Sequence, residues 1–283
     1  IIDCGIIKKL VRHKINKVFV ISRKRISNQK KYQHININFI NKNFLNIRKI
    51  PHVDYIIYSI RNKNISLSKR YFDHFKKLIK ALSKKPKILF TSSGAVYGKN
   101  KNFIKKKENS IINLKKISQL NGYKKKYALE KIFIEKKFIE LGRLNFKVSI
   151  ARCFNFIGKH SLGDGQLIGK MINDGLNKKI ISVNNSNKVY RAYLNTNDLV
   201  DWLVTILKKS TKNCPIYNVG SDKSISMKFL GKKIAKIFKK KIKFKEKKKL
   251  DTDYYVPSIN KAKKLLKLKI SINLNDSLNS FIK

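Results

Sequence analysis

The feature that most restricts the fold is a regular alternation of short apolar runs with longer amphipathic runs in the first half of the chain. The short runs have the length and composition of β-strands and lie at residues 18–22, 54–60, 87–91 and 147–151. The longer runs carry apolar residues at helical spacing and lie at residues 70–83 and 124–141. Alternating strands and helices favour a parallel sheet with helices on both faces. The sequence therefore predicts an α/β fold with a doubly wound parallel sheet.

The pattern changes after Gly158. Glycine-spaced segments replace the regular alternation, and helices are predicted at residues 166–176, 197–208, 227–238 and 259–266. A chain of 283 residues has about two ordinary domain lengths. We therefore expect a first domain at residues 1–158 and a smaller lobe at residues 159–283, with segments near residues 180–220 returning to the first domain.

The charge of the chain is at first sight that of a nucleic-acid-binding protein. Lys and Arg number 67 against 16 Asp and Glu, which gives a net charge of +51. Only nine of these cations are Arg, and Lys, Ile and Asn dominate the chain, as codons rich in A and T would produce. Specific phosphate recognition favours Arg over Lys. An AT-rich genome therefore accounts for the lysines, and we expect no specific nucleic-acid partner.

The sequence indicates neither a metal site nor a membrane anchor. Cys4, Cys153 and Cys214 lie far apart and form no C-x-x-C pair, so neither disulfides nor a thiolate zinc site is expected. No apolar run approaches the ~18 residues of a transmembrane helix, and no secretory signal opens the chain. We expect a protein of the reducing cytoplasm.

A first chemically useful motif follows the apolar run 88–90. The hydroxyl-bearing residues Thr91, Ser92 and Ser93 stand directly before Gly94. Ligands bind at the carboxyl ends of parallel strands, so these hydroxyls are well placed to meet a substrate. Taken alone, the motif is also typical of a turn.

A second motif lies inside the predicted helix 124–141. Tyr127 and Lys131 are four residues apart and share one helical face. An ammonium beside a phenol favours the phenolate and lowers the pKa of the tyrosine, which makes a general base. Taken alone, this spacing also arises by chance in a lysine-rich helix.

Further segments follow in a fixed order. They have the patterns R-x-F-N-x-x-G at residues 152–158, R-x-[FY] and D-[LV] at residues 191–199, Y-N-V-G-S at residues 217–221, and a counterpart of P-D-x-x-[KR]-A-x-x-x-L at residues 255–266. Together with the two motifs above, they resemble the NAD-dependent epimerase/dehydratase family of nucleotide-sugar enzymes, within the extended short-chain dehydrogenase/reductase superfamily. Arg152 and Arg191 are Arg in a chain that otherwise prefers Lys, and their planar fork suits a phosphate or a carboxylate.

The resemblance implies a Rossmann-like fold with a smaller C-terminal substrate-binding lobe, NAD as cofactor, a nucleotide sugar as substrate, and a homodimer. It also implies that Tyr127 takes a proton from the substrate hydroxyl, that Lys131 holds the cofactor ribose, and that Ser93 hydrogen-bonds the reacting oxygen. The cofactor-binding residues it implies are Gly5, Ser22, Arg23, Tyr58, Ser59, Ser92, Lys131 and Phe154. The substrate-binding residues it implies are Ser93, Asn155, Arg191 and Tyr193.

The beginning of the chain departs from the family pattern. The family opens with a strand and a G-x-x-G-x-x-G turn whose backbone N–H groups approach the cofactor pyrophosphate. Here only Gly5 matches, and we expect the N-terminal strand and turn to be truncated rather than lost. Arg23 stands where NAD-specific members place an acid, so it either meets the 2′-phosphate of NADP or is an ordinary loop cation.

The loop after residue 93 separates the reaction types within the family. Sugar 4,6-dehydratases resemble this site but carry an Asp-Glu pair where this chain has Gly94 and Ala95. Elimination of water needs an additional acid and base, and this loop supplies neither. We therefore expect NAD(P)-dependent hydride transfer at a sugar carbon, in the form of 4-epimerisation. The alternatives are a 4-ketoreductase that uses the same triad of Ser93, Tyr127 and Lys131, and a non-catalytic, nucleic-acid-binding member of the fold.

Overall fold

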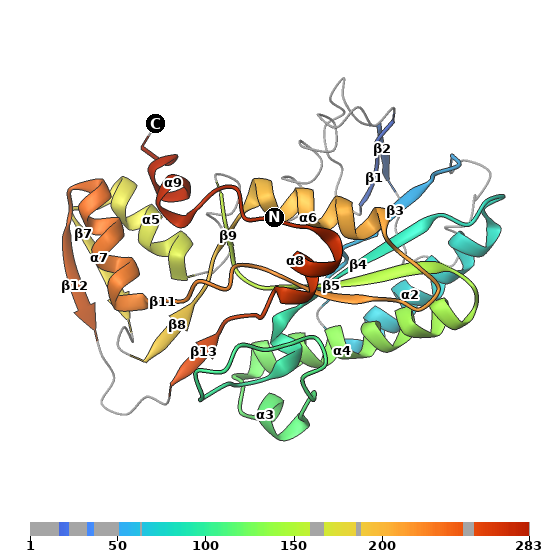
Figure 1. Cartoon of the computed structure of the whole chain (residues 1–283), viewed down its shortest axis with the longest axis horizontal. Coiled ribbons are helices and arrows are strands. Elements are labelled where there is room, and N and C mark those ends of the chain that lie inside the picture. The colour runs from blue at the N-terminus through green and yellow to red at the C-terminus, as the bar shows by residue number, and fades with distance from the viewer. Residues whose placement is uncertain are drawn as a thin grey trace.

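A parallel four-stranded sheet forms the centre of the computed structural model, which describes residues 17–22, 33–36, 51–62, 64–158, 167–184, 188–245 and 252–282. The strand order is β10–β5–β4–β3 (Figure 1). The strands are β3 (Tyr55–Tyr58), β4 (Lys87–Ser93), β5 (Lys147–Cys153) and β10 (Ile216–Val219). Every neighbouring pair in this sheet is parallel, which confirms the predicted fold class.

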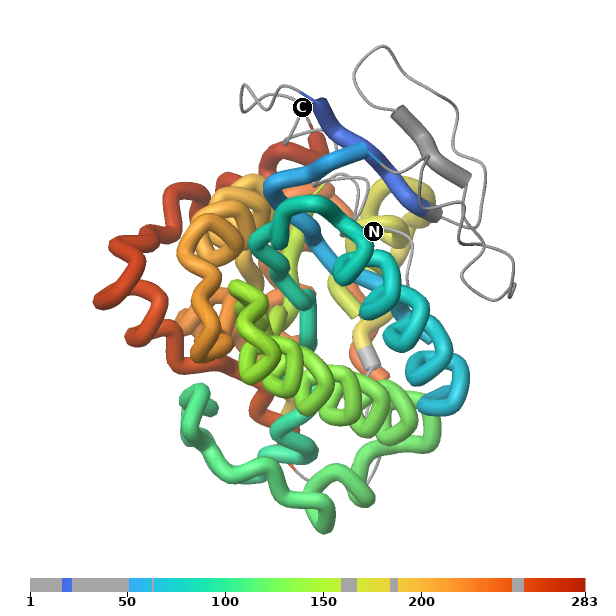
Figure 2. Tube along the Cα trace, turned by 90° about the vertical axis from the view of Figure 1, so that its right-hand side faces the viewer, coloured from blue at the N-terminus to red at the C-terminus, as the bar shows by residue number. Residues whose placement is uncertain are grey.

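Helices cover both faces of the sheet. α2 (Ile65–Ala81) and α4 (Gly122–Arg143) lie alongside each other on one face, and α6 (Thr196–Lys208) lies on the other (Figures 1 and 2). Asn64 caps the start of α2 and Asn121 caps the start of α4, and the side chain of each asparagine accepts a backbone N–H of the first turn. The predicted helices coincide with α2 and α4 except at their ends.

Aromatic side chains fill the layer between α2, α4 and the sheet. The ring centroid of Tyr58 lies 4.8 Å from that of Phe75 and 5.4 Å from that of Phe138. Phe138 in turn stacks on Phe90 at 4.8 Å. Each such pair contributes about 0.5–1.5 kcal/mol beyond the burial of its surface. On the other face, the fully buried Trp202 anchors α6. These two layers fix the carboxyl ends of β4 and β5.

Two short strands precede this sheet in the chain. β1 (Phe19–Ser22) and β2 (Gln33–Asn36) pair in parallel as a separate two-stranded sheet. β1 confirms the strand predicted at residues 18–22. The sequence pattern did not predict β2.

A second core forms the lobe at the left of Figure 1. α5 (Leu167–Asn177) and α7 (Met227–Phe238) pack on a parallel strand pair, and α9 (Leu274–Asn279) lies against α7. The strand pair is β7 (Ile180–Asn184) with β12 (Lys241–Lys245). No helix in the described part of the chain is long and apolar enough to span a bilayer.

Short strands join the two cores. They are β6 (Phe156–Ile157) with β9 (Leu194–Asn195), and the sheet of β8 (Val189–Arg191), β11 (Ile225–Ser226) and β13 (Asp253–Tyr255). After β13 the chain enters α8 (Asn260–Leu266), which packs against β10. The segment from β13 to α8 therefore returns to the central sheet before the chain ends beside α7 in the second core.

Candidate active site

Ser93 lies at the carboxyl end of β4, where the chain leaves the sheet. It caps the short 3-10 turn Gly94–Tyr97, because its Oγ accepts the backbone N–H of Ala95 at 3.2 Å. The same Oγ lies 3.5 Å from the hydroxyl of Tyr255 on β13. Ser93 is therefore a buried hydroxyl held at the junction of the central sheet and the second lobe.

Tyr127 and Lys131 reach this point from α4. The Ser93 side chain acts on the Tyr127 hydroxyl and favours its ionised form. Lys131 Nζ lies 5.6 Å from the Tyr127 ring centroid and donates to the carbonyl of Ile60 at 3.2 Å. The structure thus brings Ser93, Tyr127 and Lys131 together at the carboxyl end of the sheet.

The pKa of Tyr127 differs from the sequence-based expectation. Burial raises this pKa to about 12, and the Ser93 side chain only partly opposes the effect. Arg61 also lowers it, with its guanidinium 5.3 Å from the Tyr127 ring and 5.0 Å from the ring of Tyr123. The prediction of a lowered pKa is wrong for the chain by itself, because loss of solvent outweighs the nearby positive charges.

Lys131 has an acidic neighbour that the sequence analysis did not consider. Glu130 is buried, and its Oε2 lies 3.8 Å from Lys131 Nζ. Burial lowers the pKa of Lys131, and the charge of Glu130 raises it. The other Glu130 oxygen accepts the hydroxyl of Ser68 at 2.9 Å. Glu130 is therefore a buried carboxyl behind the lysine, and burial raises its pKa.

Of the implied substrate-binding residues, Asn155 and Arg191 border the site. Asn155 follows β5, and its Nδ2 is buried with no hydrogen-bond partner among the described residues. Arg191 donates to Asp253 Oδ2 at 2.5 Å, and its guanidinium lies 5.7 Å from the Tyr255 ring. Tyr193, in contrast, lies in the second core and donates to Met227 Sδ at 3.9 Å. Its hydroxyl does not face the triad.

Several implied cofactor-binding residues have other roles in the structure. The Tyr58 ring packs against Phe75 and Phe138 in the aromatic core, so this side chain does not face a ligand. Ser92 Oγ donates to Glu135 at 2.5 Å. Phe154 is buried against Tyr97 and Tyr255. These three side chains are therefore structural.

The remaining cofactor-binding residues are only partly described. Ser59 is half-buried directly after β3, at the same edge of the sheet as Ser93. Ser22 ends β1, and its side chain lies outside the described residues, as do Gly5 and Arg23 entirely.

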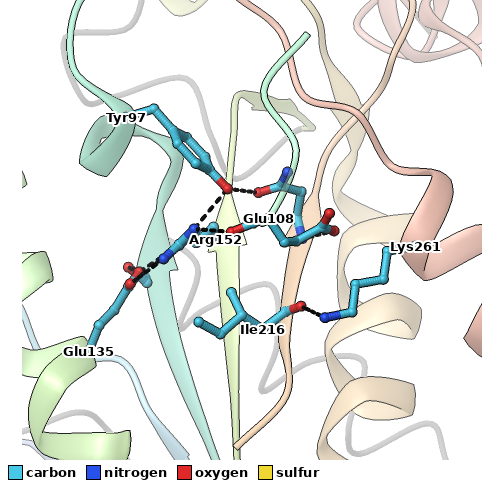
Figure 3. A network of polar contacts seen from close by, with 8 residues as sticks. Tyr97, Glu108, Glu135, Arg152, Ile216 and Lys261 are labelled. Atoms are coloured by element: carbon cyan, nitrogen blue, oxygen red, sulfur yellow. Dashed lines mark hydrogen bonds and ion pairs between the residues drawn. The ribbon is translucent and has the colours of Figure 1, made fainter. Parts of the chain in front are cut away.

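Arg152 does not face a ligand phosphate. Its guanidinium binds Glu135 through Nε and Nη2, and the Tyr97 hydroxyl through Nη1 at 2.9 Å (Figure 3). Both sequence-selected arginines are thus paired with carboxylates of the same chain, Arg152 with Glu135 and Arg191 with Asp253. Among the residues that the structure describes, no cluster of acidic, His and Cys side chains could hold a metal ion.

Tyr255 is the site residue that the sequence analysis missed. Burial raises the pKa of this phenol, which lies in hydrogen-bonding range of Ser93. The two residues are 162 positions apart in the chain, so no local spacing could have revealed the contact. The site therefore contains two phenols around one serine.

Comparison with known proteins gives one family and a set of similar folds. A sequence model of the NAD-dependent epimerase/dehydratase family matches residues 5–220. No curated protein matches the sequence. The UDP-glucose 4-epimerase of Thermotoga maritima, solved with UDP-glucose, is similar with a TM-score of 0.80 at 16% identity, over 100% of this chain and 94% of that one.

Two further solved structures have the same fold. The dTDP-glucose 4,6-dehydratase of Bacillus anthracis in complex with NAD has a TM-score of 0.80 at 16% identity, over 100% of this chain and 92% of that one. RMD from Pseudomonas aeruginosa complexed with NADPH has a TM-score of 0.73 at 17% identity, over 98% and 94%. At such identities the likeness shows the fold alone.

Proposed function

Since the chain belongs to the NAD-dependent epimerase/dehydratase family, we propose that it is a nucleotide-sugar epimerase that inverts a hydroxyl-bearing sugar carbon, C4, with NAD(P). The observation that carries this proposal is the meeting of Ser93, Tyr127 and Lys131 beside a loop with Gly94 and Ala95 in place of acids. This set of groups can move a proton to and from a substrate oxygen, but it offers no second acid and base for elimination.

The nucleotide sugar would lie between the two cores. The unpartnered Nδ2 of Asn155 supports a polar ligand there, since a buried amide without a partner is costly. Arg191 lies beside the ring of Tyr255, whose hydroxyl contacts Ser93, and its guanidinium suits a diphosphate. In this proposal residues 1–158 bind the cofactor, and residues 159–283 mainly bind the sugar nucleotide.

The donor set at Lys131 fits the ribose of a nicotinamide cofactor. An ammonium has three N–H donors. One donates to the Ile60 carbonyl and another faces Glu130, which leaves one for a ligand hydroxyl. Lys131 and Ser59 would hold the nicotinamide ribose of NAD(P). The nicotinamide would accept and return the hydride and, in its oxidised form, would add a positive charge to the site.

The proton transfers fall to the side chains of this chain. Tyr127 takes the proton of the substrate hydroxyl as the carbon becomes a ketone, and returns it when the ketone is reduced on its other face. Ser93 donates a hydrogen bond to the same oxygen, and its position on β4 fixes where that oxygen lies. Tyr127 with its pKa of about 12 is protonated at neutral pH, so added positive charge is needed to make it a base.

The test of this proposal is product analysis with UDP-glucose or dTDP-glucose and substoichiometric NAD. An epimerase yields the 4-epimer with no net change in NADH. Stoichiometric use of NAD(P)H on a 4-keto sugar would identify a ketoreductase, and a 4-keto-6-deoxy product would identify a dehydratase. Either result would replace the proposed reaction.

A further inference from the structure

Glu135 occupies the centre of a buried polar network next to the triad. It lies on α4, one turn after Lys131 and two turns after Tyr127, so the three residues share one helical face. Its Oε1 accepts the Ser92 hydroxyl at 2.5 Å and Arg152 Nε at 3.0 Å, and its Oε2 accepts Arg152 Nη2 at 2.7 Å. Glu135 therefore ties α4 to both β4 and β5.

The network continues from Arg152 toward the edge strand β10 (Figure 3). Arg152 Nη1 donates to the Tyr97 hydroxyl and to the Glu108 carbonyl, at 2.9 and 3.0 Å. The Tyr97 hydroxyl donates to Asn218 Oδ1 at 2.8 Å, and the Asn218 backbone N–H donates to Glu108 Oε1 at 2.9 Å. One continuous set of hydrogen bonds thus joins α4, β4, β5, β10 and the turn after Ser93.

Stability alone does not account for so many buried polar groups. A buried ion pair is often no more stable than apolar side chains of similar volume, because both charges lose their solvation. A buried network that is fully hydrogen-bonded does, however, restrict its members to one arrangement. Here the restricted members include the residue next to Ser93 and the helix that carries Tyr127.

We infer that Glu135 and Ser92 are positioning residues that hold the Ser93 strand against the Tyr127 helix at the distance needed for proton transfer. The inference rests on the proposed triad. Ser92 and Ser93 are the last two residues of β4, and their side chains bind different partners. Ser92 binds α4 through Glu135, and Ser93 remains available to Tyr127 and the substrate.

Ser92→Ala is the variant that tests this role with least disturbance. It removes the hydroxyl that joins β4 to Glu135 and leaves the Glu135–Arg152 ion pair in place. Ser149→Ala is the matched control, because Ser149 is a fully buried serine on the neighbouring strand β5 whose hydroxyl bonds Ser210 at 2.7 Å, away from the triad. Ser92→Thr keeps a hydroxyl at the tested position.

The expected result is a loss of kcat between about tenfold and a hundredfold in Ser92→Ala, with KM and NAD affinity within about twofold of wild type. Ser149→Ala should have a thermal midpoint similar to that of Ser92→Ala but the kcat of wild type. Ser92→Thr should recover most of the kcat that Ser92→Ala loses. Unchanged kcat in Ser92→Ala, or an equal loss in Ser149→Ala, would overturn the inference.

A readout that needs no substrate separates this inference from the proposed reaction. Fluorotyrosine incorporation, with Tyr127→Phe to assign the signal, reports the surroundings of the Tyr127 hydroxyl by fluorine NMR. The Tyr127 resonance should shift in Ser92→Ala and stay in place in Ser149→Ala. If the wild type turns over no nucleotide sugar, the proposed function fails, and this resonance alone decides whether Ser92 positions the Ser93–Tyr127 pair.

Discussion

The ring of Phe154 occupies the space directly beside the α-carbon of Gly94. A Cβ added at position 94 would lie 2.5–2.7 Å from three ring atoms of Phe154. Phe154 cannot easily move, because it is buried against Tyr97 and Tyr255. The loop after Ser93 therefore has no room for a side chain where dehydratase-like sequences carry an acid. Both the packing and the sequence therefore exclude an acidic side chain at position 94.

Gly94→Ala is expected to lower the free energy of unfolding by about 1–3 kcal/mol, because its methyl group overlaps the Phe154 ring. Phe154→Leu in the same chain should recover part of this loss. Denaturant unfolding of the two single variants and the double variant measures the coupling. Additive effects would show that the two residues do not compete for the same space.

Stability at alkaline pH reports the phenol of Tyr127, a half-buried side chain. Its pKa is raised from 10.0 to about 12, so between those pH values the folded chain keeps a proton that the unfolded chain loses. The stabilisation is therefore complete below about pH 10 and decreases as pH rises toward 12. Wild type should lose more stability than Tyr127→Phe from about pH 9 to 11. Tyr123→Phe, which removes an exposed phenol one turn earlier, should follow wild type.

Denaturant midpoints across this pH range provide the measurement. Equal pH slopes for wild type and Tyr127→Phe would mean that folding does not raise the pKa of Tyr127.

Arg191→Met should weaken nucleotide-sugar binding. The guanidinium is held by Asp253 beside Tyr255, and its loss removes a charged hydrogen-bond donor from the proposed diphosphate site. We expect KM to rise by about 10- to 100-fold with a smaller change in kcat. Arg143→Met, at the exposed end of α4, removes the same charge far along the helix from Tyr127 and serves as the control. A KM equal to that of the control would remove Arg191 from the binding site.

The order of strands and helices was predictable because it depends on local patterns. The runs at residues 87–91 and 147–151 became β4 and β5, and the ordered motifs predicted the family that the sequence model confirms. The spacing of Tyr127 and Lys131 placed both on one face of α4, as in the structure.

The partners of individual side chains were not predictable in the same way. Ser92 bonds Glu135, 43 positions further along, and Ser93 meets Tyr255, 162 positions further along. Neither contact has a local signature. The family resemblance also could not show that the Tyr58 ring points into the core under α2 and α4 rather than toward the cofactor. Successive side chains of a strand point to opposite faces, and the sequence does not say which face Tyr58 takes.

The central claim is that the Tyr127 hydroxyl transfers the proton, and epimerisation by Tyr127→Phe tests it most directly. We predict that the rate of UDP-hexose interconversion falls by about 10²- to 10⁴-fold in this variant, while the thermal midpoint and NAD affinity at neutral pH stay near wild type. Tyr123→Phe, four residues earlier on α4 and also beside Arg61, should keep a rate within about threefold of wild type. An interconversion rate within tenfold of wild type in a folded Tyr127→Phe protein that binds NAD would contradict the account.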